Sequence, residues 1–221
     1  MNRGESQSVA SRSVGDIAAN MPGASAIFRR HKLDFCCGGS ESLEQAVRRK
    51  GLELPMIEAE LASLSSEPST LPENVEDLIQ HILGRYHEVH RRELPELRRL
   101  AERVEQVHTD HPAVPKGLAD VLARIQGELE SHMQKEEQIL FPLMLTGGSP
   151  MIVHPIAMMR HEHDEAGEDL KAVSELTGDL TLPAEACNTW RALYAGLAKF
   201  AEDLTEHIHL ENNILFPKFE G

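Results

Sequence analysis

The sequence predicts an all-α protein: a small N-terminal helical domain followed by a C-terminal up-down-up-down four-helix bundle. Four long segments place apolar residues at spacings of three and four, which is typical of amphipathic helices. No segment shows sustained alternation of apolar and polar residues, so we expect essentially no sheet. Short breaks between the long segments favour antiparallel neighbours. We therefore expect a helical domain over 1–66, a linker over 67–73 and the bundle over 74–221.

The N-terminal region reads as a series of short helices. Residues 1–12 are polar and serine-rich, as in a loose terminus. Helices are expected over 14–19, 24–31, 43–50 and 56–64, because proline and glycine punctuate the chain between them. The stretch Ser-Ser-Glu-Pro-Ser-Thr-Leu-Pro at 65–72 then has the composition of a linker.

The four long segments span about 72–108, 116–145, 155–177 and 184–219. Prolines and glycines at 112–115, 147–150 and 178–183 mark the breaks between them. Histidines interrupt each apolar stripe, and the second and fourth stripes also carry a glutamate. In the second segment, for example, the stripe runs through Leu129, His132, Glu136 and Leu140.

Composition excludes several classes of partner. The chain has 36 acidic and 22 basic residues, a net charge of −14. This argues against nucleic acid and anionic membranes as partners, since both attract basic patches. There is no apolar run near 20 residues and no signal-peptide pattern. Three cysteines do not make a disulfide framework. We therefore expect a soluble protein of the reducing cytoplasm.

One sequence motif occurs twice, 75 positions apart. His132, Glu136 and the run Ile-Leu-Phe-Pro at 139–142 return as His207, Glu211 and Ile-Leu-Phe-Pro at 214–217. A histidine and a glutamate four residues apart lie on one helix face. A buried glutamate is costly unless a charge compensates it, and bound cations would do so.

Each copy has a further histidine upstream in matching register. His87 precedes His132 by 45 residues, and His163 precedes His207 by 44. Two hairpins that face each other would place four histidines and two glutamates at one level of the bundle. We expect two histidines per metal, with Glu136 and Glu211 bridging the two metals. This donor set suits iron best, with manganese and zinc as alternatives.

An isolated His-x-x-x-Glu would more simply be a buried hydrogen-bonded pair, but the duplication with two registered histidines favours a metal site. Other histidines are less clear. His108 lies roughly 31 Å along a continuous helix from His87, too far to share one site. His90 is on the same stripe and could support the site or line a path to it. The roles of His154 and His209 stay open.

The N-terminal region carries adjacent cysteines, Cys36 and Cys37, followed by Gly38 and Gly39. The glycines permit a sharp turn that presents the thiols. Neighbouring cysteines are strained as a mutual disulfide. A thiol pair suits soft-metal capture, thiol exchange or redox sensing, while a buried small-residue turn is an equally good interpretation.

The motif Asp-Phe-Cys-Cys-Gly-Gly ahead of a duplicated His-x-x-x-Glu bundle resembles the iron–sulfur cluster repair di-iron proteins, the RIC or YtfE/ScdA-type family. The similarity covers nearly the whole chain, including Arg-Tyr-His at 85–87 and Glu-His-Asp-Glu-Ala-Gly at 162–167. The resemblance implies a hemerythrin-like bundle with a non-haem di-iron centre, oxo- or hydroxo-bridged. Its implied iron ligands are the following residues: His87, His132, Glu136, His163, His207 and Glu211. It also implies that Cys36 and Cys37 influence repair or iron delivery.

The resemblance further implies that the protein restores iron–sulfur clusters damaged by nitric oxide or peroxide, by supplying iron to damaged client proteins. Two alternatives stay open: a di-iron nitric oxide reductase, and a module that binds or senses nitric oxide or dioxygen. The sensing alternative leaves Cys36 and Cys37 unexplained. The sequence does not decide whether the protein forms a homodimer.

Overall fold

The computed structural model describes residues 8–64, 72 and 74–220. Within these residues the chain is helical, with no strands and one isolated bridge between Ser13 and Ser42. The all-α prediction is confirmed. The predicted linker over 67–73 lies outside the described residues except for Pro72, as do residues 1–7 of the predicted loose terminus. The chain divides into two compact units, Met1–Leu71 with Ile208–Gly221, and Pro72–His207.

The first unit contains four short helices: α1 (Val14–Asn20), α2 (Ala24–Arg30), α3 (Leu43–Arg49) and α4 (Leu54–Ala62), with a 3₁₀ turn η1 (Val9–Ser11) before them. Side chains fix where these helices begin. Ser13 accepts a hydrogen bond from the Asp16 backbone, and Ser42 with Gln45 forms a capping box. A shared apolar core that includes Ile17, Phe28 and Phe35 holds them together.

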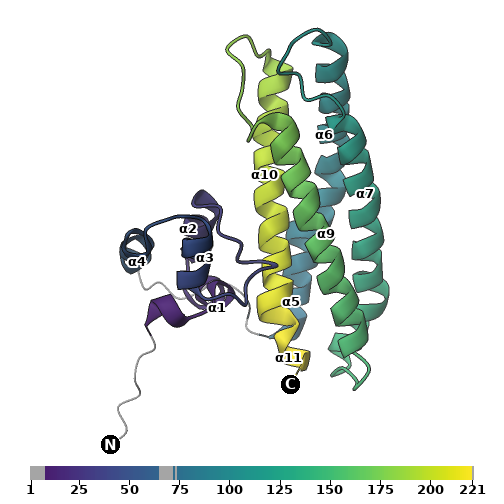
Figure 1. Ribbon diagram of the computed structural model, residues 1–221. Coiled ribbons are helices and arrows are strands. Elements are labelled where there is room, and N and C mark those ends of the chain that lie inside the picture. Colours follow the sequence, from purple (N-terminus) through teal and green to yellow (C-terminus); the bar gives the residue numbers. More distant parts are fainter. Residues whose placement is uncertain (1–7, 65–71, 73, 221) are drawn as a thin grey trace, which may run out of the picture. The chain divides into compact units, whose positions relative to one another are not determined.

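The second unit is built from long helical runs (Figure 1). The first run is α5 (Val75–Ile82), η2 (Leu83–His87) and α6 (Glu88–Val107). The second is α7 (Leu118–Lys135), η3 (Glu136–Leu140) and α8 (Phe141–Leu145). Helix α9 (Val153–Thr177) is the third run. The fourth is α10 (Asn188–Leu210) as far as His207. The end of α10 from Ile208, with η4 (Glu211–Leu215) and α11 (Pro217–Glu220), is grouped with the first unit.

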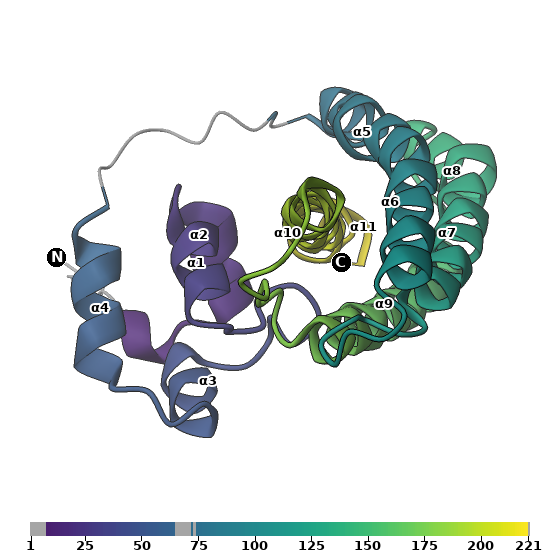
Figure 2. The same cartoon turned by 90° about the horizontal axis from the view of Figure 1, so that it is seen from above.

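The helices α6, α7, α9 and α10 lie side by side (Figures 1 and 2). Core residues such as Leu97, Leu122 and Leu197 come from the predicted stripes and are buried. Pro95 lies inside α6, which nevertheless continues to Val107. Between α6 and α10, Gly196 lets the helices approach, since a Cβ there would stand 2.5 Å from Leu97 Cδ2.

Three π-helical segments interrupt the long runs, and the sequence did not predict them. These segments are η2, η3 and η4. In a π-helical turn the hydrogen bond spans five residues instead of four, as in the 2.8 Å bond from Phe216 N to Glu211 O. Such turns are rare and occur mostly at functional sites. Each of the three begins or ends at a predicted metal ligand.

Candidate metal centre

The π-helical segments place three of the six predicted ligands. His87 is the last residue of η2, Glu136 is the first of η3, and Glu211 is the first of η4. The remaining three predicted ligands lie within regular helices: His132 on α7, His163 on α9 and His207 on α10. All six side chains are buried, and both glutamates are 0% exposed.

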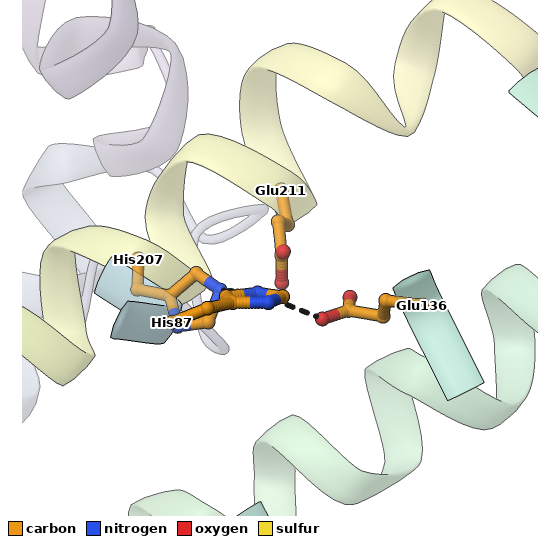
Figure 3. A group of neighbouring side chains, drawn as sticks. All are labelled: His87, Glu136, His207 and Glu211. Carbon is orange, nitrogen blue, oxygen red and sulfur yellow. Dashed lines mark hydrogen bonds and ion pairs between the residues drawn. The ribbon is translucent and has the colours of Figure 1, made fainter. Parts of the chain in front are cut away.

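The six predicted ligands form two groups of four that share both glutamates. The first group is His87, Glu136, His207 and Glu211, and the second is His132, Glu136, His163 and Glu211. In each group, one ligand atom per residue lies within 4.8 Å of every other. Figure 3 shows the first group, whose imidazoles and carboxylates point toward one another. The duplicated motif thus brings together two sites of identical composition.

Interatomic distances give the orientation of the rings. His87 Nε2 lies 3.2 Å from His207 Nε2, and His163 Nε2 lies 3.2 Å from His132 Nε2. Nitrogens bound to one metal ion at about 2.0–2.1 Å stand roughly 3 Å apart, so each pair has the spacing of two ligands on one ion. One Glu136 oxygen, Oε2, lies 3.3 Å from His87 Nε2 and 3.4 Å from His132 Nε2. The Glu136 carboxylate therefore lies close to one histidine of each group.

Two of the histidines are oriented by carboxylates on their outer side. His87 Nδ1 donates to Glu137 Oε1 at 2.8 Å, and Arg91 Nη1 donates to the same oxygen at 2.7 Å. Burial raises the pKa of Glu137, but Arg91 and His87 outweigh it and the pKa falls below its usual value. An outer carboxylate fixes the tautomer of a metal-binding histidine and keeps Nε2 available to the metal.

His132 has the equivalent arrangement. Its Nδ1 donates to Glu162 Oε2 at 2.9 Å, and Lys135 donates to the other Glu162 oxygen. The hydrogen bond from His132, aided by Lys135, lowers the pKa of Glu162 to about 2. The resemblance pointed to the stretch that contains Glu162 without giving it a role, and sequence reasoning missed Glu137. Only its place beside Glu136 in the repeat could have drawn attention to it.

The donor set fits a non-haem iron site. Imidazole nitrogens and carboxylate oxygens are ligands that iron accepts. Two carboxylates removed from solvent need a compensating charge, and a bound cation supplies it. The donor residues of the cluster are all buried and therefore shielded from bulk water.

The other histidines lie outside the two groups. His90 is buried beside His207, with ring centroids 5.5 Å apart, and burial lowers its pKa to about 2, so it is neutral at physiological pH. His108 Nε2 lies 3.2 Å from Cys187 Sγ, within hydrogen-bond distance. His154 is exposed, whereas His209 is buried against Phe35 at 5.2 Å between ring centroids.

The adjacent cysteines follow Asp34 in the first unit. Their sulfurs are 3.6 Å apart, and Cys36 Sγ lies 3.5 Å from Asp34 Oδ1. Both residues are half-buried rather than exposed. The hydrogen bond with Cys37, burial and the Asp34 charge all raise the pKa of Cys36, which keeps it a neutral thiol. Gly38 and Gly39 are not among the glycines with positive φ, so the turn does not depend on a left-handed backbone.

A helical bundle around a buried His/Glu cluster defines a class of metal-binding protein, the hemerythrin type. Residues 78–219 match the family described as the hemerythrin HHE cation binding domain. Residues 10–65 match ScdA_N, a domain of unknown function (DUF542). Among the described residues, none of the helices combines the length and apolar character needed to cross a bilayer.

Relatives narrow the class to a particular family. The chain is 48% identical to the iron-sulfur cluster repair protein YtfE of Dickeya chrysanthemi, over 94% of this chain and 96% of the relative. It is 50% identical to YtfE of Musicola paradisiaca, over 94% and 95%, and 48% identical to YtfE of Escherichia coli O81, over 93% and 94%. The chain belongs to the YtfE family of iron–sulfur cluster repair proteins. The predicted resemblance is confirmed.

Proposed function

We propose that this protein repairs damaged iron–sulfur clusters by means of a di-iron centre in its helical bundle. The observation that carries the proposal is that two groups of two histidines share Glu136 and Glu211. One iron would bind His87 and His207, the other His132 and His163. Both glutamates would bridge, and water or an oxo or hydroxo group would complete the shells.

The shared carboxylates support a role in supplying iron. One Glu136 oxygen lies close to both His87 and His132. This carboxylate would help to hold both irons, and a change in its binding mode would let one iron be labile while the other stayed held. The relatives are named iron-sulfur cluster repair proteins. We therefore propose that the clients of this protein are iron–sulfur proteins. Damage by nitric oxide or peroxide is the condition under which we expect repair.

We place this activity in the cytoplasm. Cys36, Cys37 and Cys187 are free cysteines, and thiols persist in a reducing compartment. The pair at 36 and 37 would then act as a dithiol during repair.

Substitution of the bridging glutamates tests the proposal. Glu136→Leu and Glu211→Leu should lower bound iron from two ions per chain and abolish reactivation of a nitric oxide-damaged [4Fe–4S] dehydratase. Glu165→Leu is the matched control, because Glu165 is exposed on α9 and outside both groups. Mössbauer spectroscopy on the wild-type protein reports metal identity and bridging. Full iron content and full repair in both glutamate variants would rule out the proposal.

A further inference from the structure

The two copies of the repeated motif differ immediately after their glutamates. The first copy continues Glu137-Gln138, and the second continues Asn212-Asn213. In the first copy, Glu137 contacts His87 and Gln138 is exposed. In the second copy, both asparagines point to the cysteine loop. The symmetry of the six inner residues is therefore broken at the next two positions.

The asparagines hold the backbone of the cysteine loop. Asn212 Nδ2 donates to Cys36 O at 3.1 Å, and Asn213 Nδ2 donates to Phe35 O at 3.1 Å. Asn212 is only 5% exposed, and Phe35 packs on His209, one turn earlier in α10. These hydrogen bonds are partly shielded from water, and breaking them has a cost if the groups are left without a partner.

Two glycines make room for Asn213. A Cβ on Gly15 would stand 2.5 Å from Asn213 Oδ1, and a Cβ on Gly39 would stand 2.9 Å from the same atom. Gly15 N also donates to Gly39 O at 2.8 Å. The second glycine of the Cys-Cys-Gly-Gly motif, Gly39, thus allows the cysteine loop to lie close to Asn213, in the helical segment that begins at Glu211.

The connection to Glu211 is covalent and short. Asn212 and Asn213 directly follow it within η4, where the Glu211 carbonyl accepts the π-type bond from Phe216. The backbone of this turn cannot shift at Asn212 without moving Glu211. A displacement of the cysteine loop therefore reaches Glu211 through one peptide unit from Asn212 and through two from Asn213.

We propose that Asn212 and Asn213 form a latch that couples the reactivity of Cys36 and Cys37 to metal binding at Glu211. The inference rests on the proposed function, in which Glu211 binds iron. Metal fixes Glu211 and with it the turn, so the latch holds the cysteine loop in its half-buried position. By linkage, a modification that dislodges the loop weakens iron binding. The latch residues are positioning residues, because their side chains hold the backbone of the cysteine loop.

Alkylation of the cysteines by iodoacetamide tests the latch. In this reaction the sulfur–carbon bond forms, iodide leaves, and the thiol proton passes to solvent. Mass spectrometry of the Cys36–Cys37 peptide gives the rate in iron-loaded and iron-free protein. Cys187 is an internal reference thiol in the other unit. We expect iron to slow alkylation of the pair at least about fivefold, the lower end of typical coupling between sites.

The asparagine variants should remove this dependence. In Asn212→Ala and Asn213→Ala the ratio of rates should fall to near one, while the Cys187 rate stays unchanged. Gln138→Ala, at the position of the first copy that matches Asn213, should keep the full ratio. Asn212→Asp and Asn213→Asp remove the donor N–H groups with little change in shape, and serve where an alanine variant does not fold.

The outcomes separate the latch from the proposed function. If the wild-type protein binds no iron, the proposed function fails. If it binds iron but its cysteines react at the same rate with and without the metal, the latch is wrong. Persistence of the ratio in the folded asparagine variants would also overturn it. In the wild-type protein, prior alkylation of the cysteine pair should raise the iron dissociation constant several-fold. An unchanged dissociation constant would contradict the coupling.

Discussion

Removal of the Glu137 carboxylate, which contacts the outer nitrogen of His87, is the sharpest test of how the bundle holds metal. Glu137 accepts the Nδ1 proton of His87 at 2.8 Å and is itself held by Arg91 at 2.7 Å. In Glu137→Ala this support is lost and the ring can rotate or change tautomer. The six proposed ligands are all still present in this variant.

The expected magnitude follows from the kind of contact removed. Loss of an outer partner of a metal-binding histidine typically lowers metal affinity 10–100-fold, which corresponds to about 1.4–2.8 kcal/mol of binding free energy. The metal-free protein should lose less than about 1 kcal/mol of stability, because Glu137 is 28% exposed and its pairing with Arg91 is screened by solvent. The effect should therefore appear in metal binding and much less in folding.

Chelator competition gives the iron dissociation constant, and urea unfolding of the metal-free protein gives the stability. Glu130→Ala is the matched control, since Glu130 also pairs with Arg91, at 2.8 Å, whereas the hydrogen bond to His87 Nδ1 is made by Glu137. It should change iron affinity less than threefold. Equal iron affinity in wild-type and Glu137→Ala protein would refute the reasoning. Equal losses in the two variants would assign the effect to Arg91 instead.

Three further predictions concern stability. Gly39→Ala should destabilise the first unit by about 1–3 kcal/mol in urea unfolding, because its Cβ would meet Phe35 O at 2.7 Å; Gly127→Ala, with open space around it, should be neutral or stabilising. Burial raises the pKa of Asp203, but Arg85 and Lys199 outweigh it and the pKa is lowered. Its contribution to folding stability is therefore full above the unfolded pKa near 3.9 and is lost as pH falls through the folded pKa. Asp203→Asn should therefore cost about 1.5–3 kcal/mol at pH 7 and lose this difference from wild type in acid; a constant difference in pH-dependent denaturation would contradict it. Free ferrous iron at a hundred times its dissociation constant should raise the free energy of unfolding by about 2.7 kcal/mol, and a chelator should reverse the gain in thermal scans; an unchanged melting temperature would exclude a metal site that forms only in the folded state.

The helices could be predicted because their signals are local. Stripes of leucine, isoleucine and alanine gave the long segments, and serine caps at Ser13 and Ser42 fix helix starts close to the predicted ones. Boundaries moved by a few residues, as at α4, which begins at Leu54 rather than at 56. The six residues of the two metal groups were predictable because three ligand positions each occur twice in the sequence.

The π-helical turns lay beyond this reasoning, since a stripe at spacings of three and four does not register one inserted residue. A partial signal exists in the repeated Ile-Leu-Phe-Pro. Pro142 and Pro217 each follow a π segment by two residues, and a proline supplies no backbone donor there. η2 has no such proline after it, so this signal would have found two of the three segments.

The repeat also concealed what distinguishes its two copies. A search for matching residues selects His132 with His207 and Glu136 with Glu211, and passes over Glu137 and Asn212 because they differ. Yet the structure gives these unmatched positions separate contacts, one on the outer side of His87 and one on the backbone of Cys36. Matched positions can build a symmetric pair of metal sites, but a symmetric pair cannot connect one side of the site to a single cysteine loop. That connection needs a residue present in one copy only, and the asparagines at 212 and 213 have this property.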